Sequence, residues 1–174
     1  ADIDWEAVIA HIEKMARQAT ITREGGEAYV LPPGAPIDDD PDRVVFRSYG
    51  SMTYAGLMAL IYAQVGPRDP RVRSAIDWSA QHWSLAENPG MGQQGLYFFY
   101  HVLTRSLTAS GVDLIRTADE TFVNWRQDLA ARLVSLQRID PATGHGYWEN
   151  PEARFWEGDP VLVTAYSLQV LQSL

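Results

Sequence analysis

The chain has 174 residues, of which 46% are hydrophobic, enough for a substantial core. Its formal net charge of -8 argues against a nucleic-acid partner, because phosphates repel an acidic protein. No apolar run reaches the roughly 18 residues that a bilayer-spanning helix needs, so we expect a soluble chain without a transmembrane segment. Since cysteine is absent, disulfides and thiolate metal sites are excluded, and we expect no metal or cofactor.

The start of the chain leaves its compartment open. Its first residue is Ala1 rather than Met, which is consistent with a cleaved export signal or with a segment cut from a longer protein. A cytoplasmic location and an exported one are therefore both retained.

Two kinds of helix are predicted to alternate along the chain. Amphipathic helices with one charged face are expected near residues 5–19, 70–84 and 125–138. Each is followed by a helix that is apolar almost all round, at residues 52–65, 96–107 and 160–171. A helix that is apolar on every side is buried, whereas a striped one lies at the surface. We therefore expect the second set to be an inner layer, more buried than the helices preceding it.

Local signals mark the ends of these helices. Asp69 and Asp159 each precede a proline, which combines an N-cap acceptor with a residue suited to the first helical position. Asn124 has the spacing of a capping residue for the helix that follows it. Residues 25–47, rich in Gly, Pro and Asp, predict an irregular loop, and residues 114–123 predict a small β-hairpin turning at Ala118-Asp119.

The predicted inner helices also share a repeated pattern, as a repeat architecture requires. The pattern is Thr53-x3-Leu57-x2-Leu60, Leu96-x3-Tyr100-x2-Leu103 and Thr164-x3-Leu168-x2-Leu171. We predict an all-α fold, an α/α toroid or partial barrel of about three helical hairpins, formed as one domain over residues 1–174. The centre of such a toroid is where a ligand would bind.

Several segments resemble the repeats of squalene and terpenoid cyclases and protein prenyltransferases. They are Gln137-x6-Gly144-x-Gly146-Tyr147-Trp148, similar to the QW motif, and residues 155–160, 48–53 and 88–97, similar to bacterial squalene-cyclase-like repeats. The resemblance implies an α/α toroid with an apolar central cavity for an isoprenoid chain. It also implies that the chain is the C-terminal part of a longer ring, because six helices are half of the twelve in a closed one.

The catalytic motifs of that family are not found in this sequence together with the repeats. The acidic run Asp38-Asp39-Asp40-Pro41-Asp42 lacks the spacing of the cyclases' proton-donating motif and reads as a solvated turn, and the prenyltransferases' zinc site requires a cysteine. Any activity would be of the cyclase or isomerase type. Because half a ring leaves inner faces uncovered, we expect self-association or an absent N-terminal segment to complete it.

Two carboxylic acids near the last helix are the catalytic candidates. Glu157 follows Trp156, and aromatic surroundings would raise the pKa of its carboxyl group and suit it to donating a proton. Asp159 is the second candidate, although its role as an N-cap accounts for it fully.

Aromatic residues on the inner helices and loops are the candidate ligand contacts. They are Tyr54, Tyr97, Tyr100, His101, Trp148 and Trp156. Because four consecutive aromatic residues on one helix point all round it, at least half of the run at residues 97–100 must serve packing. For His101 the alternative is a buried neutral ring bonded to a backbone carbonyl.

The sequence thus predicts a terpenoid-cyclase-like repeat domain that binds an apolar small molecule. One alternative is a toroid that acts on or binds polysaccharides, since the chain has six tryptophans to serve as sugar platforms. Another is a non-catalytic interaction scaffold. A thioester domain, which shares the toroid, is excluded by the absence of cysteine.

Overall fold

The computed structural model describes residues 30–31, 46–47 and 49–174. The chain divides into two units, Ala1–Ser48 and Tyr49–Leu174. The prediction that residues 1–174 form one repeat domain stays a prediction, because it concerns how the two units combine.

In the first unit, two short strands pair inside the segment that was predicted to be an irregular loop. Strand β1 (Val30–Leu31) lies parallel to β2 (Phe46–Arg47). The segment is therefore not wholly irregular, since β-branched and aromatic residues favour a strand where a partner is within reach. The helix predicted near residues 5–19 and the acidic run at residues 38–42 lie outside the described residues.

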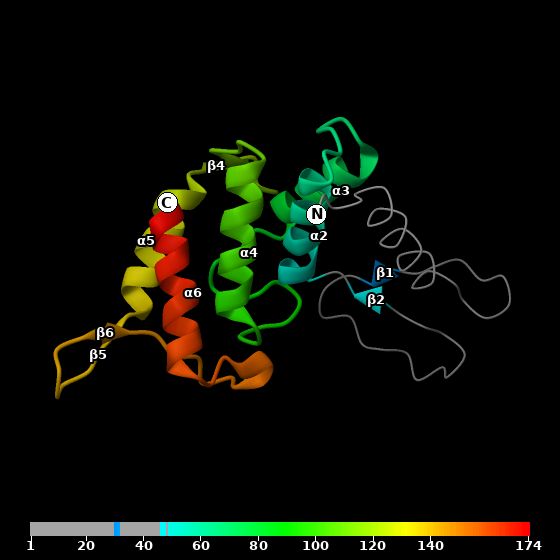
Figure 1. The fold of residues 1–174 in the computed structure, drawn as a ribbon. Helices are drawn as coiled ribbons and strands as arrows, with labels where there is room; N and C mark the ends of the chain where they lie inside the picture. The colour runs from blue at the N-terminus through cyan, green and yellow to red at the C-terminus, as the bar shows by residue number, and fades with distance from the viewer. Residues whose placement is uncertain (1–29, 32–45, 48) are drawn as a thin grey trace, which may run out of the picture. The chain divides into compact units, whose positions relative to one another are not determined.

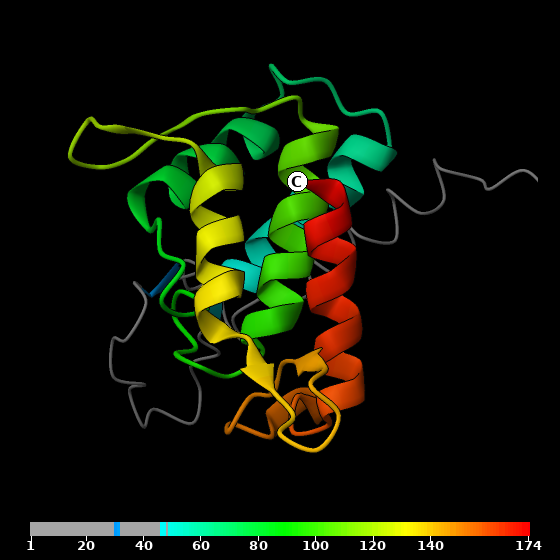
Figure 2. The same cartoon turned by 90° about the vertical axis from the view of Figure 1, so that its left-hand side faces the viewer.

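The second unit is mainly helical, as the sequence predicts. Its helices are α2 (Gly50–Tyr62), α3 (Pro70–Gln81), α4 (Leu96–Ala109), α5 (Trp125–Leu136) and α6 (Pro160–Ser173). Helices α2, α4 and α6 run in the same direction, with α4 packed between the other two (Figures 1 and 2). No helix among the described residues has the length and apolar character needed to cross a bilayer.

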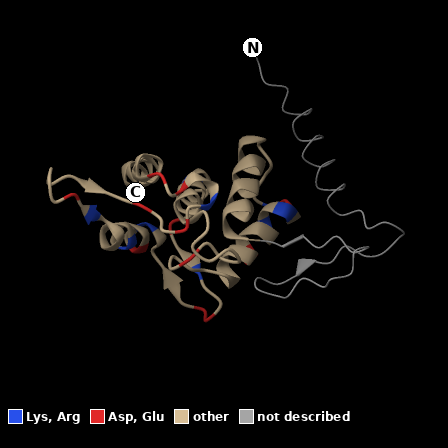
Figure 3. Cartoon of the chain, turned by 90° about the horizontal axis from the view of Figure 1, so that it is seen from below, with Lys and Arg blue, Asp and Glu red and all other residues tan. Residues whose placement is uncertain are grey.

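The difference between the two kinds of helix is visible in charge and burial. Helices α2 and α6 contain no charged residue and α4 contains only Arg105, whereas α3 and α5 each carry three (Figure 3). Nine of the fourteen residues of α4 are buried, and α2 has four buried residues against two in α3. The expectation is wrong for α6, which has three buried residues, as many as α5. Nothing among the described residues covers the outward face of α6, as its exposed Val161 and Leu168 show.

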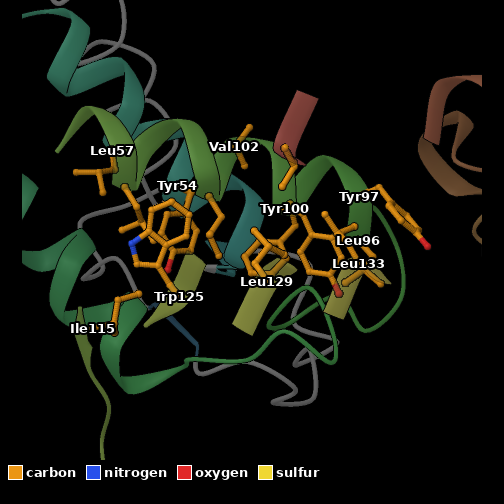
Figure 4. Packing of buried hydrophobic residues seen from close by; sticks show 14 of the residues in the cluster. Tyr54, Leu57, Leu96, Tyr97, Tyr100, Val102, Ile115, Trp125, Leu129 and Leu133 are labelled. Atoms are coloured by element: carbon orange, nitrogen blue, oxygen red, sulfur yellow. The ribbon is translucent and has the colours of Figure 1, made fainter. Parts of the chain in front are cut away.

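Helix α4 contributes the largest share of the buried hydrophobic core, and residues of α2, α5 and α6 pack around it. The apolar stripe of α5, formed by Trp125, Leu129 and Leu133, is 0% exposed. Leu129 and Leu133 point toward Tyr100 and Leu96 of α4 (Figure 4). Burying a large apolar side chain contributes about 1.5–3 kcal/mol, so this stripe is a main attachment of the outer layer.

Two antiparallel hairpins flank α5. The first, β3 (Ile115–Arg116) with β4 (Phe122–Val123), turns at residues 118–119 and confirms the predicted hairpin. The second, β5 (Arg138–Ile139) with β6 (Gly146–Tyr147), lies in the QW-like segment. A Cβ atom at Gly146 would lie 2.8 Å from Cδ of Gln137, so glycine is what permits this close packing.

The predicted helix caps form. Asp69 accepts a hydrogen bond from the N–H of Arg71 at 2.8 Å, Asp159 from the N–H of Val161 at 2.9 Å, and Asn124 from that of Gln127 at 3.2 Å. Each satisfies one of the free donors that every helix N-terminus exposes.

Helix α2 is capped differently, by a loop that lies far from it in the sequence. Its N-cap residue, Tyr49, makes no side-chain capping bond. Instead the N–H of Ser51 donates to Oδ1 of Asn88 at 2.9 Å, and the N–H of Gly50 donates to the carbonyl oxygen of Pro89 at 2.8 Å. Nδ2 of Asn88 donates to Ser51 Oγ and to the carbonyl oxygen of Gln94. The loop before α4 thus completes the start of α2.

Replacing this buried amide should destabilise the unit strongly. Asn88→Ala leaves the N–H of Ser51 and the carbonyl of Gln94 without partners, and each buried orphan costs about 1–3 kcal/mol. We expect the free energy of unfolding to fall by about 2–4 kcal/mol in urea titrations. The matched control is Glu87→Ala, at the exposed neighbouring residue, which should change stability by less than about 0.5 kcal/mol.

Candidate functional site

Glu157, the first acidic candidate, is enclosed and hydrogen-bonded through both carboxylate oxygens. It is 0% exposed. Its Oε1 accepts from the N–H of Phe98 and its Oε2 accepts from Nδ2 of Asn150, each at 2.7 Å. The N-cap residue of helix α4 is Gly95, which has a left-handed φ of 67° and no side chain to act as a cap. Glu157 therefore supplies the missing cap, where a negative charge also interacts favourably with the helix dipole.

Asp159 lies on the surface and caps α6 through the N–H of Val161. The structure thus places one acidic candidate in the interior and the other in solvent. Each has a structural role that accounts for its position.

Tyr97 and Tyr100 point from α4 toward the loops and α5. The hydroxyl of Tyr100 donates to the carbonyl oxygen of Leu85 at 2.5 Å and accepts from Nε of Arg132 at 3.4 Å, while that of Tyr97 donates to the carbonyl oxygen of Glu149 at 3.5 Å. Burial raises the pKa of both phenols, that of Tyr97 to about 12. These two residues join the inner helix to the outer layer.

The other aromatic candidates are separated from one another. Trp148 is 3% exposed, and its indole N–H donates to the carbonyl oxygen of Leu133 at 2.8 Å. Trp156 is 83% exposed. His101 is half-buried with its ring 5.4 Å from that of Tyr166, and burial, together with the charge of Arg105, lowers its pKa.

Tyr54 carries a buried hydroxyl that has no hydrogen-bond partner among the described residues. Burial raises its pKa to about 12, although the nearby Ser79 hydroxyl acts in the opposite direction. Ser79 directs its own proton to the carbonyl oxygen of Ala75. Tyr54 is therefore an unfavourably buried phenol that packs against Phe99, with ring centroids 5.8 Å apart.

A pocket of about 270 Å³, called the aromatic pocket here, opens at the N-terminal ends of α2 and α4 beside α6. Its walls carry no charged side chain. The lining residues are Tyr49, Ser51, Met52, Gly95, Phe98, Phe155 and Tyr166.

Phe155 is held at this pocket by unusual backbone geometry. It belongs to the short 3-10 helix η1 (Arg154–Trp156), where Phe155 and Trp156 have positive φ values of 60° and 68°. For bulky residues this conformation costs about 1–3 kcal/mol each. Gly95 makes room for the ring, since a Cβ there would lie 3.3 Å from Phe155 Cδ2. The guanidinium group of Arg154 stacks on the Phe155 ring, with Cζ 4.9 Å from the ring centre, and donates to Gln94 Oε1.

The aromatic pocket lies beside two of the predicted ligand contacts but is not lined by any of the six. None of the six predicted ligand contacts is among its lining residues, although His101 touches Tyr166 and Trp156 adjoins Phe155. Of the aromatic run at residues 97–100, only Phe98 faces the pocket. The signal that was missed is the repeated tripeptide Glu-Asn-Pro at residues 87–89 and 149–151, which marks the two loops that cap α2 and hold Glu157 at α4.

Comparison with known proteins does not assign the chain to a family. No protein-family model, no curated protein and no solved structure matches the chain. Among the described residues, no group of three or more His, Asp or Glu side chains is placed to hold a metal ion. The function is accordingly inferred from the geometry of the site.

Substituting the buried carboxylate tests its structural role. In Glu157→Gln one oxygen can still accept from Phe98, but the new amide N–H2 faces the donor Nδ2 of Asn150. We expect a loss of about 1–3 kcal/mol in the free energy of unfolding, measured in urea. Glu152→Gln, at an exposed site in the same loop, is the control. Equal stability of the two variants would contradict the capping role.

Removing the unpartnered hydroxyl should stabilise the unit. Tyr54→Phe keeps the ring and deletes a buried polar group, so we expect a gain of about 1 kcal/mol at pH 7. Phenols titrate near pH 10 in an unfolded chain and near 12 at Tyr54. Because ionising this phenol costs more in the folded state than in the unfolded one, it leaves stability independent of pH below pH 10 and lowers stability as the pH rises toward 12. Urea titrations at pH 7 and 11 should show a smaller alkaline loss for Tyr54→Phe than for Tyr62→Phe, an exposed-site control.

Proposed function

We propose that the second unit is a terpenoid-cyclase-like repeat domain that binds a compact apolar ligand, of the isoprenoid class, in the aromatic pocket. The observation that carries the proposal is the lining: four aromatic rings and one methionine surround a hollow with no charged side chain. Ligand sites are typically concave, apolar and equipped with few polar groups, here Ser51. The parallel helices α2, α4 and α6, with α3 packed on α2 and the apolar stripe of α5 on α4, support a partial α/α toroid as the scaffold (Figures 1 and 4).

The size of the pocket limits the ligand. A water-sized group occupies about 30 Å³ of liquid, so 270 Å³ corresponds to about nine heavy atoms. This holds most of a ten-carbon isoprenoid, or the end of a longer chain, with the remainder leaving the pocket past Met52 and Phe155. Both residues are about half exposed, 53% and 50%, so they stand at the entrance.

The positions of Glu157 and Asp159 favour ligand binding without catalysis. Both oxygens of Glu157 are engaged by donors, so protonating a ligand would break the cap of α4. Asp159 is engaged at the start of α6. A cyclase-type reaction would need an acid from elsewhere.

A glycan ligand is the second candidate, and one observation favours it. Trp156 is 83% exposed and follows Phe155, which places a flat aromatic surface beside the pocket. Exposed tryptophan faces serve as platforms for sugar rings. Binding of an isoprenoid is expected to depend on Phe155, whereas binding of a glycan is expected to depend on Trp156.

A binding experiment separates them. Geraniol, a ten-carbon isoprenoid alcohol, is titrated into the protein by isothermal calorimetry and by two-dimensional NMR. We expect Phe155→Ala to weaken binding by about tenfold, because a large part of the apolar contact is lost. The control is Phe122→Ala, which removes an exposed ring from β4.

The outcomes are distinct. Geraniol binding that Phe155→Ala leaves unchanged would refute the aromatic pocket as its site. Binding of a hexasaccharide that depends on Trp156 and not on Met52 would favour the glycan instead.

A further inference from the structure

A second pocket lies at the other end of α4 from the aromatic pocket. It has a volume of about 350 Å³ and is called the hairpin pocket here, because the β3–β4 hairpin closes one side of it. Its other walls come from α2, α3 and the last turn of α4, and its residues include Leu57, Ser79, Ala80, Leu107, Ile115 and Phe122. No residue lines both pockets, so the two sites are separate.

The hairpin pocket leads from solvent into the hydrophobic core. Leu114 and Phe122 at its outer end are more than half exposed. Leu57, Leu107 and Ile115 at its inner end are buried core residues. At about 30 Å³ for each water-sized group, the volume corresponds to about twelve heavy atoms. The pocket is therefore large enough for a small organic molecule whose apolar part packs against the core.

The hydroxyl of Tyr54, beside the inner end of the pocket, has no hydrogen-bond partner among the described residues. Tyr54 is buried at the same end of the core as Leu57 and Trp125 (Figure 4). Its hydroxyl is near that of Ser79, a residue of the pocket wall, whose own proton goes to the carbonyl oxygen of Ala75 at 2.7 Å. Because burial raises the pKa of Tyr54 to about 12, the phenol keeps its proton and remains available as a donor. An acceptor that reaches it would remove the cost of a buried, unsatisfied hydroxyl.

The charges around the pocket favour a neutral ligand. Asp77 and Arg116, the charged residues of its lining, are both exposed and have opposite signs. Arg116 is also paired with Glu120, with Nη2 2.9 Å from Oε1. An ionised group at the inner end would be unpaired among apolar side chains, which is costly. A neutral oxygen avoids this cost and can still accept a hydrogen bond.

We propose that the hairpin pocket binds a neutral, largely apolar small molecule whose oxygen accepts a hydrogen bond from the Tyr54 hydroxyl. A ketone or an ester meets this requirement, because a carbonyl oxygen accepts and brings no proton that needs a partner of its own. The apolar part of the ligand lies against Leu57, Leu107 and Ile115. The proposal also explains why the core keeps a hydroxyl whose removal should stabilise the unit, since binding sites commonly retain groups that cost stability. This second site goes beyond the isoprenoid binding proposed for the aromatic pocket and does not depend on it.

Two compounds with one carbon skeleton test the hydrogen bond. Benzylacetone carries a carbonyl oxygen where butylbenzene has a methylene group, and both are small enough for the pocket. Each is titrated into the whole chain and followed by two-dimensional NMR at the indole N–H of Trp125. This group donates to the carbonyl oxygen of Val112, a residue of the pocket wall, so its signal reports on the site.

The expected result is a change in selectivity. Tyr54→Phe should weaken the binding of benzylacetone by about tenfold, because the carbonyl oxygen then enters the core without a donor. The same substitution should leave the affinity for butylbenzene within about twofold, since the ring and the apolar walls are unchanged. Comparing the two ratios cancels the different hydrophobicity of the compounds. Folding is not at risk, because Tyr54→Phe is expected to stabilise the unit.

Two matched variants define the site. Tyr62→Phe removes an exposed hydroxyl from the same helix and should leave both affinities within about twofold. Phe155→Ala alters the aromatic pocket and should have as little effect on benzylacetone. The Trp125 signal also shows whether geraniol enters the hairpin pocket, whose lining includes Phe122.

Three results would overturn the proposal. The first is that neither compound shifts the Trp125 signal in a saturable way. The second is that Tyr54→Phe changes the affinities for the two compounds by the same factor, which would make the phenol a packing residue only. The third is binding of benzylacetone that shifts the indole signal of Trp156 and not that of Trp125, which would place the ligand at the aromatic pocket.

Discussion

The free N–H groups at the start of the inner helices are the constraint on which the second unit depends. Neither α2 nor α4 begins with a side chain that caps it. Ser51 at the start of α2 donates to Asn88, and Phe98 at the start of α4 donates to Glu157. In both cases the partner comes from the loop before the next inner helix, so each repeat is completed by its successor. A stack of helices that packed equally well without these loops would leave buried donors unsatisfied.

This arrangement also explains why the aromatic pocket lies where it does. The loop that brings Glu157 under α4 must turn sharply, and it does so with Phe155 and Trp156 in left-handed conformations. The turn places the ring of Phe155 over Gly95, at the junction of α2, α4 and α6. The carboxylate is thereby committed to capping, while the rings remain available to a ligand. Helix capping and the proposed ligand contact thus fall to neighbouring residues of one loop.

Helix α6 differs from the other inner helices in two ways. It carries its own cap, Asp159, so its start needs no successor loop. Its outward face, including Leu168, nevertheless keeps the apolar pattern that is buried in α2 and α4. The start of α6 is thus capped, while its outward face stays exposed among the described residues.

The sequence by itself determined the local elements of the second unit: its helices, the caps at Asp69 and Asp159, and the hairpin over residues 114–123. These follow from short-range periodicity and capping chemistry, which act within a few residues. The direction of each aromatic side chain, by contrast, was decided only when the helices packed, because a run such as residues 97–100 points to every side of its helix. For the same reason the sequence could nominate Glu157 as an acid, and only the tertiary structure could show that both of its oxygens are bound, by donors 59 and 7 residues away.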